Sequence, residues 1–308
     1  MQRFVFFDFD GTLADTSEGI YAAFDDAAIE LGLGTISGDR KTGLIGPPIK
    51  ESFKKYYGLD ELEARRAAEV FREQYAKQEH LLKTEFYSGI KETLQQLSEE
   101  GYVLGVATNK RTDCAERILT ECGLRELFAT VRGSESGSYV TKDQIVAQAL
   151  HDVGCTYGFN GVMVGDTSGD FDAAMKNGLS FVGVTYGFGF YEGSPLGGAD
   201  GAVSTPAELP GTLCHVFESM HADSFYIDYD NKLFGFYEEK ADATAAMTEM
   251  QDVFGCAHGE VKSVHGFVEG WVKTMEEQGL SRLEVTLSIK NGLRKLTNDM
   301  QVWQSSGF

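Results

Sequence analysis

Cysteine and proline are scarce in this chain of 308 residues, which has 5 of each. The cysteines are scattered, odd in number and free of any CxxC pair. This pattern argues against a disulfide framework and against a zinc site, and it favours reduced thiols in a cytoplasmic protein. The positions are Cys114, Cys122, Cys155, Cys214 and Cys256.

Long apolar runs and an excess of positive charge are also missing. No run approaches the length of a membrane span, and the N-terminus shows no signal-peptide pattern, so we expect no membrane partner. The chain has 47 acidic residues against 27 basic ones, a formal net charge of −20. Such a surface repels phosphate backbones and argues against nucleic-acid binding. An anionic small substrate would therefore need a locally positive site, supplied by a metal ion or by lysines.

Short apolar runs alternate with helical segments up to about residue 210. Most of these runs are continuous, as in parallel strands that are covered on both faces. Strands that alternate with helices predict an α/β fold with a doubly wound parallel sheet, in which ligands bind beyond the carboxyl ends of the strands. The predicted strands are 3–9, 102–108, 129–134, 161–166 and 180–186, and the predicted helices are 91–101, 114–123, 142–154 and 170–178.

Two segments interrupt this alternation. Residues 15–85 are helical, with glycine- and proline-bearing joints, and predict an all-α insertion, here called the cap. Residues 217–308 combine strand and helix signals, with hairpin turns at Asp230-Asn231 and Asn291-Gly292. We therefore expect a core made of residues 1–14 and 86–215, a helical cap at 15–85 and a small C-terminal α+β unit at 217–308.

The first chemical motif is DFDGT at residues 8–12, directly after the first apolar run. A carboxylate at a strand tip, here Asp8, can attack phosphorus and form an aspartyl-phosphate. A second carboxylate two residues on, Asp10, can protonate the leaving oxygen and later activate water. Because clustered aspartates repel each other, the pair also indicates a cation between them, and Mg²⁺ prefers a few such oxygens plus waters. The alternative interpretation is an ordinary Asp-Gly strand end.

The second motif is VMVGDTSGDFDAA at residues 162–174, where another apolar strand ends in Gly-Asp. Its loop offers Asp166, Asp170 and Asp172. Asp166 stands where it can complete a metal site, and Asp170 can orient a ligand or a metal-bound water. The same spacing also fits an N-capped helix start.

Two further segments supply hydrogen-bond donors and a cation. VATNK at 106–110 places Thr108 and Asn109 at a strand end, where uncharged donors suit phosphoryl oxygens. Lys142 opens a helix upstream of Asp166, where a cation would neutralise charge on a phosphoryl group and its nucleophile. Taken alone, the Thr-Asn pair also fits turn chemistry, and a single lysine also fits a solvated surface.

In this order, the elements DxDGTL, (T/S)N, K and GDxxxD resemble the haloacid dehalogenase superfamily. They are most similar to its phosphatases that carry a helical cap after the first strand. The resemblance covers roughly residues 3–212, and the four elements are specific when taken together. It implies a Rossmann-like core, a mobile cap and Mg²⁺ as cofactor.

The resemblance also implies a role for each matched position. Asp8 would be the nucleophile and Asp10 the general acid/base, whose backbone carbonyl also binds Mg²⁺. Asp8 and Asp166 would bind the metal, with support from Asp170. Phosphate would lie against Gly11, Thr108, Asn109 and Lys142. The lysine departs from the Lys-Pro pair of many relatives, since here it stands in Thr141-Lys142-Asp143.

The presence of Asp10 argues against two other reactions of this superfamily, dehalogenation and phosphonate cleavage. Dehalogenases lack the second aspartate and the metal, and phosphonate-cleaving relatives usually carry a small residue at the position of Asp10.

The cap segment GLIGPPIKESF at 43–53 resembles the specificity segment of phosphoglycolate-phosphatase-like enzymes, and similar caps occur in relatives that look like 5′-nucleotidases. Lys50, together with Arg40 and Lys41, is a candidate for contact with the non-reacting end of the substrate.

The sequence therefore predicts a Mg²⁺-dependent phosphomonoester hydrolase that acts on a small phosphorylated metabolite. A 5′-nucleotidase, and a phosphotransferase such as a sugar phosphomutase, use the same motifs and stay open as alternatives. A binding or regulatory protein is an alternative of a different class. The C-terminal unit has no counterpart in the minimal family pattern, and we expect it either to support a homo-oligomer or to pack as a structural extension.

Overall fold

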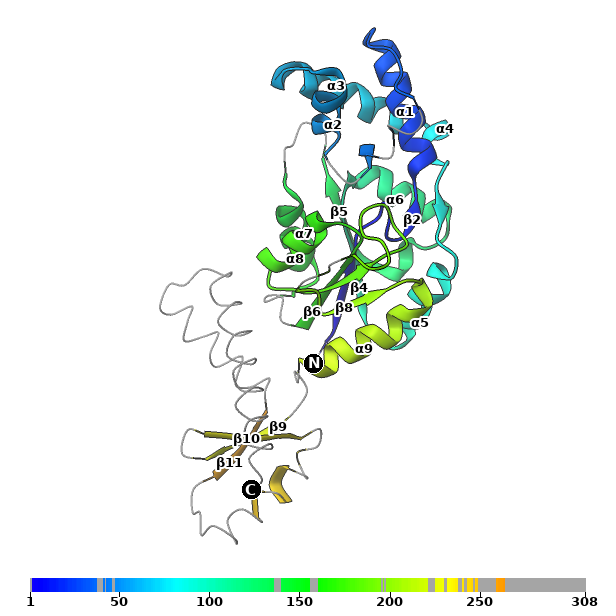
Figure 1. The fold of residues 1–308 in the computed structure, drawn as a ribbon. Helices are drawn as coiled ribbons and strands as arrows, with labels where there is room; N and C mark the ends of the chain where they lie inside the picture. The colour runs from blue at the N-terminus through cyan, green and yellow to red at the C-terminus, as the bar shows by residue number, and fades with distance from the viewer. Residues whose placement is uncertain are drawn as a thin grey trace.

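A six-stranded parallel sheet forms the centre of the protein (Figure 1). The computed structural model describes residues 2–37, 41, 43–45, 48–135, 140–155, 160–194, 196, 198–220, 225–229, 232–237, 240, 243–245, 247–248 and 259–263. The strand order is β5-β4-β1-β6-β7-β8, and each neighbouring pair is parallel, which confirms the predicted α/β fold class. The strands are β1 (Phe4–Phe7), β4 (Val103–Arg111), β5 (Phe128–Ser134), β6 (Gly161–Gly165), β7 (Ser180–Val184) and β8 (Gly201–Val203).

Strand β1 lies between β4 and β6 and is buried along its whole length. Val5 and Phe7 pack in the cluster that includes α5, α6 and α9, whereas Phe4 and Phe6 pack with α7 and α8. Because successive side chains of a strand point to opposite faces, a continuous apolar strand requires helices on both faces of the sheet. These helices are α5 (Ile90–Glu99), α6 (Thr112–Glu121), α7 (Lys142–Asp152), α8 (Ser168–Lys176) and α9 (Leu209–Ser219).

Each predicted strand and helix of the core overlaps an observed one, but β8 and α9 were not predicted. Strand β8 has three residues, of which only Val203 is buried, so its apolar run is too short to stand out. Helix α9 carries Pro210 in its first turn, where a missing N–H group costs little, and it extends across the predicted start of the C-terminal unit. Two short 3₁₀ turns precede β5 and α9, at Arg125–Leu127 and Pro206–Glu208.

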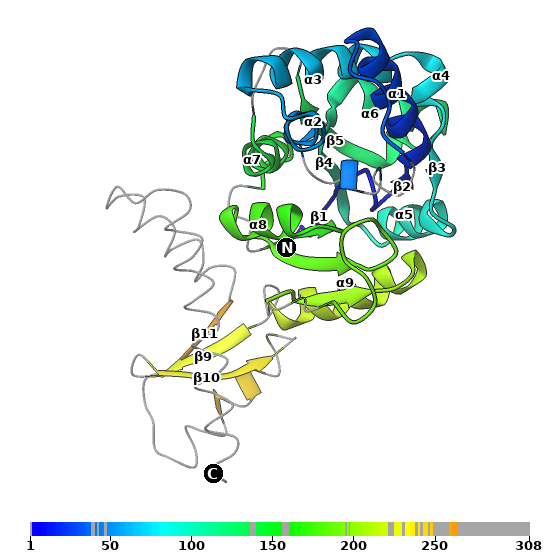
Figure 2. The ribbon, with the colours of Figure 1, turned by 45° about the horizontal axis from the view of Figure 1, so that its top comes forward.

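The cap helices are inserted between two short strands, β2 (Ala14–Asp15) and β3 (Glu85–Phe86), which pair antiparallel. The rings of Phe24 and Phe53 stack inside the cap with their centroids 4.4 Å apart. Figures 1 and 2 show the cap beyond one end of the sheet, and a contact between Tyr75 of α3 and Lys110 of β4 identifies it as the carboxyl end. The described cap helices are α1 (Ser17–Glu30), α2 (Ile49–Tyr57), α3 (Glu61–Tyr75) and α4 (Gln78–Leu81).

The described strands after residue 220 form a separate antiparallel sheet in the order β10-β9-β11. They are β9 (Phe225–Tyr229), β10 (Lys232–Tyr237) and β11 (Gly259–Ser263). Strands β9 and β10 flank the predicted Asp230-Asn231 turn and pair antiparallel, whereas the predicted Asn291-Gly292 hairpin lies outside the described residues. None of the helices in the described ranges is long and apolar enough to cross a membrane.

Candidate active site

The carboxyl ends of β1 and β6 bring two of the predicted aspartates together. Asp8 follows β1 and Asp166 follows β6, and the Asp8 N–H donates to the Val164 carbonyl at 2.9 Å. Asp170 stands in the first turn of α8, directly after this loop. One carboxylate oxygen from each of these three aspartates lies within 4.8 Å of the others, and all three side chains are buried.

Lys142 contacts this carboxylate cluster from the first residue of α7. Its Nζ atom lies 2.5 Å from Asp8 Oδ1 and 2.9 Å from Asp170 Oδ1. Burial acts to lower the pKa of Lys142, but the carboxylates of Asp170 and Asp8 outweigh it and leave the pKa raised. The side chain of Gln144 accepts from the Thr141 N–H at 3.0 Å, which fixes the helix start that carries the lysine.

Burial disfavours the ionised form of two carboxylates in this cluster. Burial raises the pKa of Asp8 to about 6, although the Lys142 ammonium acts in the opposite direction. Burial also raises the pKa of Asp166 to about 7, and the neighbouring carboxylates add to this. The N–H groups of Phe188 and Gly189 donate to Asp166 Oδ2 at 2.8 and 3.2 Å and act to lower that pKa without offsetting the burial.

These three carboxylates fit a small divalent cation. Hard cations take oxygen ligands, and carboxylates that burial and mutual repulsion have destabilised gain most from an added positive charge. Asp8, Asp166 and Asp170 supply such oxygens within one buried cluster. The donor set therefore fits a metal ion. The sequence predicts Asp8, Asp10 and Asp166 as the ligands, with Asp170 in support, and this ligand set stays a prediction.

Asp170 is fixed by its own local hydrogen bonds. Its Oδ2 atom accepts from the Thr167 hydroxyl at 2.6 Å and from the Thr167 N–H at 3.1 Å, while its own N–H donates to Thr167 Oγ1 at 3.3 Å. Thr167 is the N-cap of α8, which agrees with the helix-start interpretation of this spacing. The capping box holds Asp170 with its Oδ1 atom against Lys142.

Asp10 has partners different from those of Asp8. Its Oδ1 atom accepts from the Thr16 hydroxyl at 2.6 Å and lies 2.8 Å from Lys110 Nζ. The predicted phosphate-binding residues Thr108 and Asn109 lie in the last part of β4. Thr108 is buried and accepts from the Lys110 N–H at 3.3 Å, whereas Asn109 is exposed.

Gly11 allows Asp166 to approach the loop after β1. Its φ angle is +83°, and a Cβ atom there would lie 2.2 Å from Asp166 Oδ2. Its N–H donates to the Ala14 carbonyl at 2.9 Å. The contacts of Gly11 with the rest of the protein therefore serve the turn and the close approach of Asp166.

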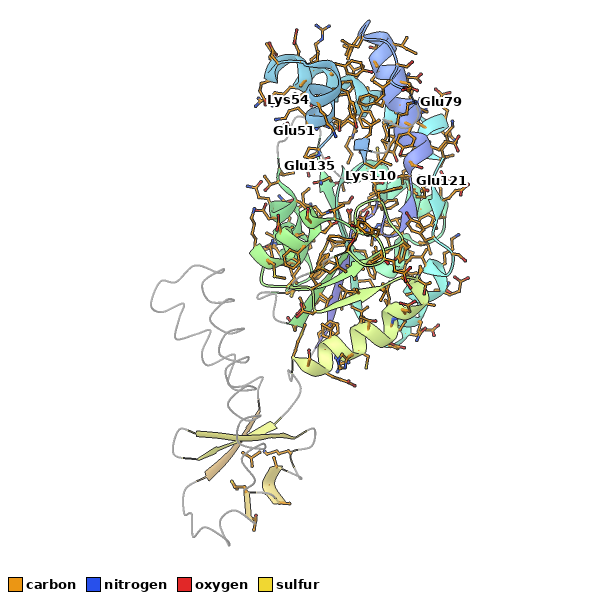
Figure 3. All side chains as sticks on the ribbon, in the orientation of Figure 1. Glu51, Lys54, Glu79, Lys110, Glu121 and Glu135 are labelled. Carbon is orange, nitrogen blue, oxygen red and sulfur yellow. The ribbon has the colours of Figure 1, made fainter. Side chains whose placement is uncertain are left out.

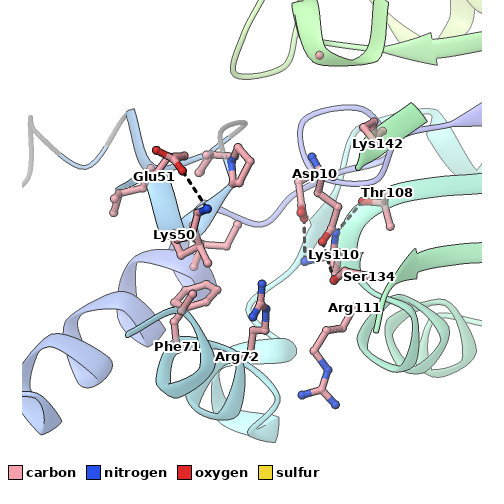
Figure 4. Close-up of a pocket in the computed structure, with 18 of the residues that line it drawn as sticks. Asp10, Lys50, Glu51, Phe71, Arg72, Thr108, Lys110, Arg111, Ser134 and Lys142 are labelled. Carbon is pink, nitrogen blue, oxygen red and sulfur yellow. Dashed lines mark hydrogen bonds and ion pairs between the residues drawn. The ribbon is translucent and has the colours of Figure 1, made fainter. Parts of the chain in front are cut away.

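A cavity of about 760 Å³ lies between the cap and the core, and Asp8, Asp10 and Asp170 line it. Thr108, Asn109 and Lys142 line the same cavity, so the structure brings these predicted residues to one space. The cap adds apolar side chains and basic ones, which Figure 4 shows around the cavity. The cap lining includes Leu44, Ile45, Lys50, Arg65, Phe71 and Arg72.

Lys50 lines the cavity but is already paired within the cap. Its Nζ atom donates to Glu61 Oε1 at 2.8 Å. It also lies 3.4 Å from Glu51 Oε1, the contact that Figure 4 marks. Lys41 forms an ion pair with Asp25, and Arg40 lies outside the described residues.

Sequence reasoning missed Lys110, the last residue of the VATNK segment. Its side chain is 3% exposed, and Figure 3 shows it between the cap helices and the sheet. Its amine contacts Asp10 and donates to the Tyr75 hydroxyl at 2.6 Å. A lysine in a strand-end segment is usually expected at the surface, and no local signal in the sequence indicates that a cap helix covers Lys110.

Comparison with known proteins identifies the family of this chain. The sequence pattern of haloacid dehalogenase-like hydrolases matches residues 5–184, which is more than half of the chain. A crystal structure described as a predicted phosphatase from Clostridium acetobutylicum superposes with a TM-score of 0.64 at 32% identity, covering 70% of this chain and 99% of that one. The chain belongs to the haloacid dehalogenase-like hydrolase family. Within it, the chain stands with the capped phosphatases that the motifs indicated.

Curated relatives carry three different activities in their names. A 5′-nucleotidase of Pseudomonas aeruginosa is 33% identical over 60% of this chain and 83% of its own length. A phosphoglycolate phosphatase of Vibrio parahaemolyticus is 27% identical over 70% of this chain and 95% of its own length. The tyrosine-protein kinase PtkA of Mycobacterium tuberculosis is 35% identical over 61% of this chain and 63% of its own length. The relatives therefore share phosphoryl chemistry and differ in substrate.

Proposed function

We propose that this protein is a Mg²⁺-dependent phosphomonoester hydrolase that forms an aspartyl-phosphate on Asp8. The observation that carries the proposal is the position of Asp8: its carboxylate lines the cavity, contacts Lys142 and belongs to the buried cluster with Asp166 and Asp170. A carboxylate that attacks phosphorus must be ionised, and positive charge beside it must offset the charge of the phosphoryl group. Asp8 supplies the carboxylate and Lys142 the positive charge.

In the proposed first step, an oxygen of the Asp8 carboxylate attacks phosphorus and the bond to the leaving oxygen breaks. Asp10 donates a proton to that oxygen, so the product leaves as an alcohol. In the second step, Asp10 accepts a proton from water as the water attacks phosphorus. The acyl-phosphate bond breaks, phosphate leaves and the Asp8 carboxylate is regenerated.

The other site residues bind and orient the phosphoryl group. Thr108 and Asn109 would donate to phosphoryl oxygens, Gly11 would lie beside them, and Lys142 would offset charge on the nucleophile. Mg²⁺, when bound to Asp8, Asp166 and the Asp10 backbone carbonyl, would supply further positive charge to the phosphoryl oxygens. Asp170 would hold Lys142 in place beside this site.

The substrate we propose is a small phosphorylated metabolite, as in phosphoglycolate-phosphatase-like enzymes. The 5′-nucleotidase relative supports a second candidate, a nucleoside monophosphate, and the cavity of about 760 Å³ lies in the size range of typical small-molecule sites. Phe71 on the cavity wall offers an apolar surface that a nucleobase could use. Lys50 lies on the same wall and would have to leave Glu61 and Glu51 to bind an anionic end. A sugar phosphomutase remains the phosphotransferase alternative.

A phosphate-release screen in the presence of Mg²⁺ tests this proposal. The panel should include phosphoglycolate, nucleoside monophosphates and sugar phosphates, with Asp8→Asn as the inactive variant. Asp172→Asn is a matched control, because Asp172 is an exposed aspartate of α8 that does not line the described cavity. Isomerisation of a sugar phosphate without release of phosphate, or full activity of Asp8→Asn, would reject the proposal.

Two further predictions concern the setting of the protein. The described cysteines, Cys114, Cys122, Cys155 and Cys214, form no disulfide, which supports a reducing, cytoplasmic location. A homo-oligomer formed through the C-terminal unit stays a prediction, which size determination in solution can test.

A further inference from the structure

Lys110 joins the core to the cap through its amine. The residue lies in β4 and is buried. Its Nζ atom lies 2.8 Å from Asp10 Oδ1 in the core and donates to the Tyr75 hydroxyl of cap helix α3 at 2.6 Å. These two partners belong to the two structural units that enclose the cavity, so one ammonium group touches both.

Aromatic rings enclose the same ammonium. Nζ lies 4.3 Å from the ring centroid of Tyr75 and 5.4 Å from that of Phe9, distances at which a cation is attracted to a ring face. Tyr75 is itself buried and stacks on Phe71 with centroids 5.8 Å apart. A buried ammonium is costly unless it is paired, so the position of Lys110 depends on Asp10 and on Tyr75 together.

The Asp10 carboxylate is held at one oxygen from two sides. Lys110 Nζ and the Thr16 hydroxyl both contact Oδ1, the hydroxyl at 2.6 Å. Thr16 is the N-cap position of α1, where the chain enters the cap. Both contacts leave Oδ2 as the oxygen that can carry a proton to and from the cavity. Figure 4 shows Asp10 and Lys110 side by side at the cavity.

We propose that Lys110 is a positioning residue that couples docking of the cap to the orientation of Asp10, with Tyr75 as the contact on the cap. The inference rests on the proposed hydrolase function, in which Asp10 protonates the leaving oxygen. With the cap docked, Tyr75 covers the ammonium and Asp10 is held for proton transfer. When the cap lifts, Lys110 loses Tyr75 and gains water, so its contact with Asp10 weakens and Thr16 becomes the main group that orients the carboxylate. The acid/base step is thereby favoured only when the cap excludes water.

Leaving-group dependence tests this coupling in the full-length protein. The rate of leaving-group release in a single turnover is measured with two kinds of substrate. p-Nitrophenyl phosphate has a leaving group that needs little protonation, whereas phosphoglycolate and AMP release alkyl alcohols, whose oxygen must be protonated as the bond to phosphorus breaks. General acid catalysis contributes about 10²–10⁴-fold, so Lys110→Met should slow the alkyl substrate by about 10²-fold and the nitrophenyl substrate by less than about 10-fold. A purely structural role would slow both by the same factor and would overturn the proposal.

A double-mutant cycle tests whether Tyr75 acts through Lys110. Tyr75→Phe removes one oxygen and keeps the ring. It should reduce the rate with the alkyl substrate by about 3- to 10-fold, which is less than the whole contribution of general acid–base catalysis. Added to Lys110→Met, it should have no further effect, since the two residues act as one unit. Tyr57→Phe is the matched control, because its hydroxyl donates to the Gly34 carbonyl within the cap. Independent, multiplicative effects of Tyr75 and Lys110 would reject the coupling.

Hydrogen exchange separates this inference from the proposed function. Amide exchange of residues 61–75 should be faster in Lys110→Met and in Tyr75→Phe than in the wild type, and unchanged in Tyr57→Phe. Unchanged exchange in both variants would overturn the docking role even in an active enzyme. Absence of phosphate release by the wild type would instead reject the hydrolase function, while the exchange result would still decide whether Lys110 docks the cap.

Discussion

The Nζ atom of Lys142 lies 2.5 Å from Asp8 Oδ1, although the two residues are 134 positions apart in the sequence. The same amine lies 2.9 Å from Asp170 Oδ1. One cation from the start of α7 therefore contacts two carboxylates, one at the end of β1 and one in the first turn of α8. This arrangement ties the charge of the proposed nucleophile to Lys142.

Replacing Lys142 by methionine should reduce kcat by about 10²–10³-fold, the usual effect of removing one electrostatic partner of a reacting group. It should also move the acidic limb of the pH–rate profile to higher pH. Burial already raises the pKa of Asp8 to about 6, and the Lys142 charge opposes that rise, so its loss raises the pKa further and the ionised nucleophile appears only at higher pH. The profile of kcat/KM at fixed Mg²⁺ measures this. Lys176→Met is the control, since that lysine side chain is 63% exposed. An unshifted acidic limb would contradict the assignment.

Stability of the metal-free protein should fall as pH rises from about 4 to about 7. The folded-state pKa values of Asp8 and Asp166, about 6 and about 7, lie above the ordinary value of 3.8, so between these limits the folded state binds more protons than the unfolded state. A bound Mg²⁺ reverses this penalty, because it binds the ionised carboxylates. Thermal unfolding with and without Mg²⁺ at pH 5 and pH 7.5 should therefore show that Mg²⁺ stabilises the protein more at pH 7.5. With Mg²⁺ at 100 times its Kd at pH 7.5, the free energy of unfolding at that pH should rise by about 2.7 kcal/mol.

Asp166→Asn is the partner variant for that measurement. It should stabilise the metal-free protein at pH 7.5, because a neutral amide replaces a buried carboxylate, and it should weaken the Mg²⁺ response. Equal stabilisation by Mg²⁺ in the wild type and in Asp166→Asn would show that the ion binds elsewhere.

Gly11→Ala should destabilise the protein by about 1–3 kcal/mol from backbone strain, with a further steric contribution. The φ angle of +83° disfavours a side chain, and the new Cβ would meet Asp166 Oδ2 at 2.2 Å. Gly32→Ala is a matched control, because Gly32 has a φ angle of +70° and no atom within 4 Å of the added Cβ. Urea unfolding compares the two variants, and a loss no greater for Gly11→Ala than for Gly32→Ala would count against the close approach.

Much of the core could be predicted from the sequence because its signals are local. Continuous apolar runs such as residues 161–165 are typical of parallel strands covered on both faces, and the carboxyl ends of such strands meet at one edge. That geometry is enough to bring Asp8 and Asp166 together before any coordinates are known. The three-residue strand β8 carries no comparable signal and was missed.

Contacts between the cap and the core could not be predicted in the same way. Lys110 depends on Tyr75 of a different structural unit, 35 positions away, and nothing in VATNK indicates that a helix covers it. Likewise, the N–H groups that hold Asp166 come from Phe188 and Gly189, and backbone donors leave no trace in residue identity. The sequence therefore yields the reacting carboxylates more readily than the groups that orient them.

The most direct test of the central claim is to trap the covalent intermediate. Asp10→Asn should still form some aspartyl-phosphate but hydrolyse it slowly, because its amide cannot accept a proton from water. This variant is mixed with Mg²⁺ and a turned-over phosphomonoester, quenched in acid and digested, and the peptide that contains residues 5–16 is sequenced by mass spectrometry. A phosphoryl group on Asp8, absent from Asp8→Asn, is the expected result. A phosphoryl group on another residue, or phosphate release without any phosphorylated protein in either the wild type or Asp10→Asn, would contradict the proposed mechanism.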